Sequence, residues 1–245
     1  MNTANEIIRE DKLLRKIVQA IVNANGINLR TYLLENALET NNALMMKKGD
    51  YINDNLRHQV VNDNIELIPF RRYGWEGRIL WDHVNKITYT IVTIQTLKMI
   101  PKKKNRSLPH YLHSILFAEN SKFEPRVKQL DLGDFGIAEP SLFDPEELLA
   151  DYIKIVGNNV TELNGCSHYV VAYESSHFQV HNIELILLDK DFQIVDKESL
   201  NEFITPDFST LTVPEDNSDE VEDIKSLINT KAGIKPKLLK DDKKA

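Results

Sequence analysis

Residues 87–97 read ITYTIVTIQTL, and this stretch carries the strongest β-strand pattern in the chain. β-Branched and aromatic residues alternate through Ile91, which is typical of a strand within a sheet. The next apolar residues after Ile91, Val92 and Ile94, both occupy even-numbered positions, so on a regular strand their side chains would point to the opposite face. We therefore expect a β-bulge near Val92, or a strand that is buried on both faces.

Two further strands are expected before this stretch and three after it. Each is a run of alternating apolar residues bounded by turn residues. The runs cover residues 65–71, 76–82, 168–174, 181–188 and 192–195. Short connections within the first pair and the last pair predict hairpins, and therefore a mainly antiparallel sheet.

Helical periodicity dominates the N-terminal third and recurs between the strands. The clearest helix start is Asp144-Pro145-Glu146-Glu147, because Asp144 can cap the helix and Pro145 suits its first position. Gly26 and Gly49 are expected to end the first two helices. Helices are expected over residues 7–21, 28–46, 50–62, 107–118, 144–156, 197–204 and 221–228.

This order of elements predicts an α+β protein. N-terminal helices would pack on a mainly antiparallel sheet, followed by a second α/β half and a charged C-terminal tail. Residues 119–143 are acidic and rich in Pro and Gly, so they are expected to separate the halves 1–118 and 144–204. Each half has few strands, so we expect one composite domain. Residues 205–245 would hold a linker, a short helix and a mobile basic tail.

Composition excludes several classes of protein. Of the 245 residues 27% are charged, and the net charge is −7, as in ordinary soluble proteins. The single cysteine, Cys166, excludes an intramolecular disulfide framework and suits a reducing compartment. No signal-peptide pattern opens the chain, and no apolar run approaches the ~18 residues that a membrane span requires. The sequence predicts a cytoplasmic protein without a membrane partner.

Basic and aromatic residues gather between positions 71 and 106. Arginine beside aromatic rings can stack on bases and bind phosphate. The candidate nucleic-acid-binding residues are Arg71, Arg72, Tyr73, Trp75, Arg78, Lys102, Lys103, Lys104 and Arg106. A solvated hairpin followed by an exposed lysine run explains the same pattern without a ligand.

Nuclease chemistry has one candidate pair, Arg106 and His113. The six residues between them fit the loose Arg–His spacing of one class of helical-bundle ribonucleases, in which the pair binds phosphate and transfers a proton. A metal-dependent nuclease would need an acid-x-Lys motif, and the strand after Asp82 offers only Gln95 and Lys98, three positions apart. That motif is absent.

Three helices followed by a strand pair is also the order of a winged helix. The third helix, over residues 50–62, would then enter the major groove. Its charged residues are net acidic, whereas phosphate contacts require Lys and Arg. This favours a helical cap packed on the sheet.

A metal site is conceivable at Cys166, His168, His177 and His181, whose side chains are of the types that bind zinc. Their spacing matches no standard structural zinc site. Separate strand-edge histidines and a buried thiol are the alternative. Nucleotide-binding glycine motifs are absent, and no cofactor is expected.

Two functions stay open. Acidic blocks at 131–151 and 215–223 suggest a non-catalytic binding or regulatory protein with a protein partner. Abundant Lys, Asn and Ile have A/T-rich codons and indicate an AT-rich microbial genome. A role of such a bacterial protein in mobile-element defence or toxin–antitoxin biology is a hypothesis that no motif in the sequence carries. The alternative is a nucleic-acid-binding protein or nuclease that uses the basic region 71–113. A nuclease should gather these residues around one cleft, and a protein-binding module should leave them scattered.

Overall fold

The computed structural model describes residues 11–36, 40, 42–72, 74–103, 107–123 and 143–205. The chain divides into two units, Met1–Thr205 and Pro206–Ala245, and all of these residues lie in the first. The helix start at Ile7, the helix expected at 221–228 and the basic tail lie outside the described residues.

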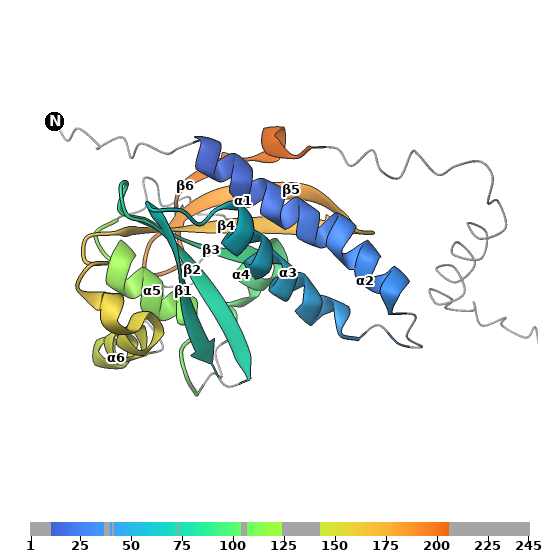
Figure 1. Ribbon diagram of the computed structural model, residues 1–245. Coiled ribbons are helices and arrows are strands. Elements are labelled where there is room, and N and C mark those ends of the chain that lie inside the picture. Colours follow the sequence, from blue (N-terminus) through green and yellow to red (C-terminus); the bar gives the residue numbers. More distant parts are fainter. Residues whose placement is uncertain are drawn as a thin grey trace, which may run out of the picture. The chain divides into compact units, whose positions relative to one another are not determined.

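A six-stranded sheet forms the centre of the first unit (Figure 1). Its strands lie side by side in chain order: β1 Ile65–Arg72, β2 Trp75–Asp82, β3 Ile87–Thr93, β4 Ser167–Ser176, β5 Gln179–Leu188 and β6 Ile194–Ser199. Every neighbouring pair is antiparallel except β3 and β4, which are parallel. The predicted α+β class with a mainly antiparallel sheet is confirmed.

Helices cover both faces of this sheet (Figure 1). One face carries α1 Asp11–Asn23 and α3 Leu44–Gln59, and α2 Leu29–Glu35 continues the line of α1 (Figure 1). The crossover that a parallel pair requires holds α4 Ile94–Met99, α5 Tyr111–Asn120 and α6 Pro145–Val156, of which α5 and α6 cover the other face. Among the helices that the structure describes, none is long and apolar enough to cross a membrane.

Strand β4 divides the core into two layers. Tyr169, Val171 and Tyr173 pack on the α1 and α3 side, whereas Val170 and Ala172 pack on the α5 and α6 side. Successive side chains of a strand point to opposite faces, so a central strand covered on both faces is apolar throughout.

Two predicted helix ends were wrong. The first helix continues through Asn25 and Gly26 as a π-helical turn, Ala24–Asn28, that joins α1 to α2. Asn25 is buried, and its side-chain amide donates to the carbonyl of Ile21 at 2.8 Å, so this residue supports the helix that it was expected to end. Gly49 lies inside α3, because packing on the sheet outweighs the intrinsic preference of one glycine.

The predicted strand 87–97 ends early, at Thr93. The hydroxyl of Thr93 accepts a hydrogen bond from the Thr96 amide at 3.0 Å and caps α4. The expected bulge is absent from β3, and the alternative expectation is confirmed: Tyr89 packs in one core layer and Val92 in the other, so β3 is buried on both faces up to its end at Thr93.

Other element boundaries shifted as well. The helix expected from Ser107 begins at Tyr111 and is capped by His110. The helix expected at 197–204 is mostly strand, because β6 runs to Ser199 and only a 3₁₀ turn, Asn201–Phe203, follows. The start at Asp144 is confirmed: its carboxylate accepts from the Glu146 amide at 2.8 Å.

Candidate binding site

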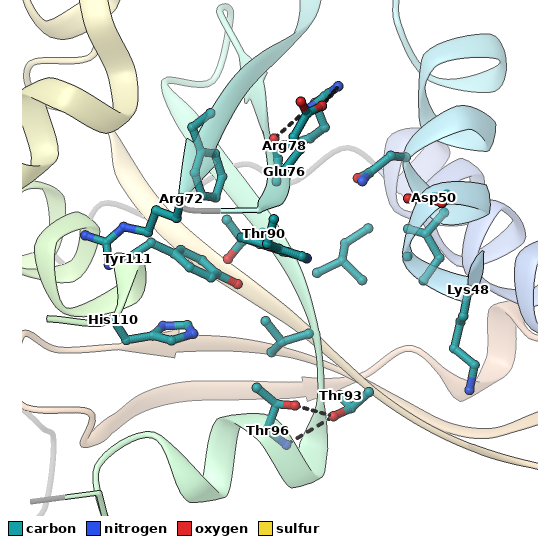
Figure 2. Close-up of a pocket in the computed structure, with 18 of the residues that line it drawn as sticks. Lys48, Asp50, Arg72, Glu76, Arg78, Thr90, Thr93, Thr96, His110 and Tyr111 are labelled. Atoms are coloured by element: carbon teal, nitrogen blue, oxygen red, sulfur yellow. Dashed lines mark hydrogen bonds and ion pairs between the residues drawn. The ribbon is translucent and has the colours of Figure 1, made fainter. Parts of the chain in front are cut away.

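A cavity of about 990 Å³ lies between the β1–β2 hairpin, β3 and α3 (Figure 2). It forms because β2 and β3 pair only at Leu80↔Tyr89, Trp81↔Thr88 and Asp82↔Ile87. Beyond Tyr89 the hairpin and β3 diverge, and the lining includes residues of both sheet faces. The volume is at the upper end of the range for ligand pockets.

Three aromatic rings form one wall of the cavity. Trp75 and Tyr111 stack with ring centroids 5.5 Å apart, and Phe70 meets the edge of Trp75 at 5.6 Å. Gly77 permits this packing, because a Cβ atom there would lie 2.4 Å from the ring of Phe70. Burial raises the pKa of Tyr111 well above its usual value, so its hydroxyl stays protonated.

Large apolar side chains are exposed around the cavity. Met45 and Met46 of α3 are 72% and 68% exposed, and Trp75 and Leu108 are 48% and 49% exposed. All four belong to the cavity lining. Exposed apolar residues gathered around one cavity are a common mark of an interaction site.

The arginines of the cavity wall have carboxylate partners. Arg72 pairs with Asp151 of α6 and also donates to the carbonyl of Pro109. Arg78 lies 3.6 Å from the carboxylate of Glu76. Much of the positive charge on this wall is therefore compensated within the protein.

Helix α3 supplies the charged residues on the opposite side of the cavity, where Figure 2 shows Lys48 and Asp50. The ammonium group of Lys48 donates to the hydroxyl of Ser175 at 3.0 Å. Partial burial lowers the pKa of Lys48 from its ordinary value. Lys48 and Asp50 carry opposite charges, so this side adds little net charge.

The structure brings together only part of the predicted nucleic-acid-binding set. Arg72, Trp75 and Arg78 line the cavity, whereas Arg71 does not, and its guanidinium lies 3.8 Å from Glu76. Lys102 and Lys103 are exposed beyond α4 and are not part of the lining. Tyr73, Lys104 and Arg106 lie outside the described residues.

His113, the candidate catalytic histidine, is on α5 and outside the cavity lining. Its ring packs edge-on against Phe143 and Phe192, with centroid distances of 5.4 and 4.8 Å. Its predicted partner Arg106 is not among the residues that the structure describes. The surroundings of His113 are therefore those of a packed aromatic residue.

The candidate metal ligands lie in two separate places. Cys166 and His168 stand at the start of β4, and His177 and His181 lie at its far end and on β5. Nine residue steps, nearly all within β4, separate His168 from His177, a distance of roughly 30 Å. Within the described ranges, no three His, Cys, Asp or Glu residues are grouped to hold a metal ion. Burial raises the pKa of Cys166 to about 11, so it remains a neutral thiol.

His168 belongs instead to a buried chain of hydrogen bonds. The hydroxyl of Thr90 lies 2.9 Å from its Nε2 and that of Thr88 lies 2.7 Å from its Nδ1. Thr88 donates to Glu119, which also accepts from the hydroxyl of Tyr152 at 2.9 Å. If Thr88 donates to Glu119, His168 carries its proton on Nδ1 and accepts from Thr90 at Nε2.

Burial favours the neutral forms of the two titratable side chains in this hydrogen-bonded network, Glu119 and His168. It raises the pKa of Glu119 to about 7 and lowers the pKa of His168 to about 3. Thr90 connects this series of hydrogen bonds to the cavity, because Thr90 is also a lining residue. We assign this series of hydrogen bonds a structural role, since His168 and Glu119 are both buried.

Sequence reasoning missed the α3 side of the cavity and the buried carboxyl. Met45 and Met46 form an adjacent pair of flexible apolar residues in a polar helix, and this pattern could have marked an exposed apolar site. Glu119 follows Leu112, Ile115 and Leu116 at helical spacing. An acidic residue on the apolar side of a helix was the available signal for a buried titratable group.

Comparison with known proteins gives a family and no function. No curated protein matches the chain, and no solved structure matches it. One family does match, and it covers residues 7–244, nearly the whole sequence. The chain therefore belongs to the family of unknown function DUF5986.

Proposed function

We propose that the protein is a non-catalytic binding protein whose cavity receives a segment of a partner protein. The observation that carries this proposal is the group of exposed apolar side chains at the cavity, Met45, Met46, Trp75 and Leu108. Their exposure leaves apolar area in water that a partner could cover, and each buried Å² contributes about 25 cal/mol.

The residue types suit a polypeptide partner. Methionine side chains are flexible and polarisable, so Met45 and Met46 can adapt to an irregular apolar surface. Tryptophan is enriched among the residues that dominate protein interfaces, and Trp75 is half-exposed in the lining of the same cavity.

The charge of the cavity favours a protein over a nucleic acid. Polyanion binding depends on unpaired Lys and Arg that displace counterions from phosphates. Here Arg72 is paired with Asp151 and Arg78 lies near Glu76. The more exposed cations, Arg71, Lys102 and Lys103, lie outside the cavity lining.

Site-specific photo-cross-linking tests the proposal. A photoreactive phenylalanine derivative at Met45 should yield one stoichiometric protein adduct in cells of the source organism. Ile153 is the matched control, because it is an exposed apolar helix residue outside the cavity lining. The purified partner should then bind Met45→Glu at least about tenfold more weakly than wild type, and bind Ile153→Glu normally.

Two outcomes would overturn the proposal. One is an equal pattern of adducts at positions 45 and 153, which would indicate random contact. The other is saturable binding of a labelled oligonucleotide at low salt that weakens in Arg71→Ala and Lys103→Ala, because this would favour the nucleic-acid alternative.

A further inference from the structure

We infer that the partner segment binds as an extended β-strand between β2 and β3 and completes the sheet there. The inference rests on the proposed function and specifies how the same cavity is filled. In Figure 1 the β1–β2 hairpin extends away from the rest of the sheet, and the cavity occupies the opening.

The opening is a gap in an otherwise paired sheet. β1 pairs with β2 from Ile65↔Asp82 to Arg72↔Trp75, and β3 pairs with β4 from Ile87↔Ser167 to Thr93↔Tyr173. Between β2 and β3, pairing stops at Leu80↔Tyr89. Among the described residues, no strand pairs with the facing edges of residues 75–79 and 90–93.

The β3 edge of the gap presents backbone groups at Ile91. The Ser167 amide donates to the carbonyl of Lys86 at 3.0 Å, so Lys86 directs its backbone groups toward β4. Alternate residues of a strand face the same neighbour, which places the backbone groups of Thr90 and Val92 toward β4 as well. The N–H and C=O of Ile91 then face the gap.

The β2 edge presents the backbone of Arg78. Leu80 faces Tyr89 across the paired part of the sheet, and Arg78 is two residues before it on the same edge. The other neighbour of Arg78 is Pro69, which has no N–H to donate. This agrees with a backbone at Arg78 that is directed into the gap.

An inserted strand would therefore find hydrogen-bonding groups on both sides and apolar side chains on both faces. One face meets the aromatic wall of Phe70, Trp75 and Tyr111, and the other meets Met45 and Leu56 of α3. A strand buried on both faces carries apolar residues at successive positions. The expected partner segment is a short run of β-branched or aromatic residues, bound by β-augmentation.

The test begins with a displayed library of random 12-residue peptides, selected on the full-length protein. Peptides that bind Met45→Glu more weakly than wild type are kept, because they use the cavity. Hydrogen exchange of single amides is then measured by NMR with and without the selected peptide. We expect the Ile91 and Arg78 amides to slow by at least about tenfold relative to Val92, which is the control because its amide faces β4.

N-methylation of the peptide gives a second readout that does not depend on the stability of a protein variant. A bound strand should lose affinity when alternate residues are methylated and tolerate methylation of the residues between them. The strand inference would be overturned if a Met45-dependent peptide showed no alternation in its response to N-methylation and did not slow hydrogen exchange at the Ile91 and Arg78 amides. That result would leave the proposed function intact. Failure to select any Met45-dependent peptide, together with no adduct at position 45, would overturn both.

Discussion

Glu119 and His168 lie in the core layer between β3, α5 and α6, where charged side chains are costly. Their pKa values are shifted in opposite directions, and each shift favours the neutral form of the residue. Thr88 lies between the two side chains and contacts both. The pair therefore resembles a neutral hydrogen-bonded chain more than an ion pair.

Replacement of Glu119 by Gln should change how stability depends on pH. The pKa of Glu119 is raised from 4.5 to about 7, so its contribution to stability is full below pH 4.5 and is lost as the pH rises through 7. Relative to wild type, the free energy of unfolding of Glu119→Gln should rise by about 3 kcal/mol between pH 4.5 and 7.5. Urea unfolding at the two pH values measures this difference.

His168 acts in the opposite direction and supplies the internal control. Its pKa is lowered from 6.5 to about 3, so its contribution is present above pH 6.5 and is lost as the pH falls toward 3. Between pH 4.5 and 6.5 the two effects should nearly cancel in wild type, whereas Glu119→Gln should lose stability on acidification. Parallel pH profiles for the two proteins would contradict the assigned burial of Glu119.

Substitution of Gly77 and of Gly49 by alanine should change the free energy of unfolding in opposite directions. A Cβ atom at Gly77 would lie within 2.7 Å of the rings of Phe70 and Trp75, whereas at Gly49 nothing lies within 4 Å. We expect Gly77→Ala to lose about 1–3 kcal/mol through overpacking. Gly49→Ala should gain about 0.5–1 kcal/mol inside α3. Thermal or urea unfolding of both variants provides the check, and a stabilised Gly77→Ala would refute the close aromatic packing.

The helices show which sequence signals are reliable and which are not. The cap at Asp144 was predictable because the cap, Pro145 and the following glutamates act within one turn of α6. The end expected at Asn25-Gly26 was wrong because Asn25 is buried and bonds back to Ile21. That bond depends on where the helix packs, and a local pattern does not contain this information.

Removal of the Asp144 cap should weaken α6. Asp144→Ala leaves the Glu146 amide without its side-chain acceptor, and a loss of about 1 kcal/mol in the free energy of unfolding is expected. Asp144→Asn keeps an equivalent acceptor and should remain close to wild type. Equal stability of the Ala and Asn variants would show that the cap contributes nothing.

Arg72 connects three parts of the first unit that are distant in sequence. It stands at the end of β1, pairs with Asp151 of α6 and donates to the carbonyl of Pro109 before α5. The sequence placed Arg72 in a cluster of phosphate-binding candidates. In the folded protein its guanidinium is mostly buried and has these intramolecular partners.

Asp151→Asn should therefore destabilise the protein. The substitution leaves a mostly buried guanidinium without its counter-charge, and we expect a loss of about 1.5–3 kcal/mol. Arg71→Gln is the control, because Arg71 is an exposed neighbour on the same strand and should change stability by less than about 0.5 kcal/mol. If urea unfolding shows equal stability for Asp151→Asn and Arg71→Gln, the Arg72–Asp151 pair does not stabilise the fold.

Local periodicity was enough to predict the α+β class, the approximate positions of the strands and the start of α6. These features depend on residues within a few positions of one another. The cavity could not be predicted in this way, because it depends on how far β2 and β3 remain paired after Leu80 and on α3 lying beside the opening. Ile87 pairs with Ser167 across the whole crossover, and this register is set by contacts between distant residues. Such contacts leave no periodic trace in the sequence, so the gap in the sheet became evident only in the folded chain.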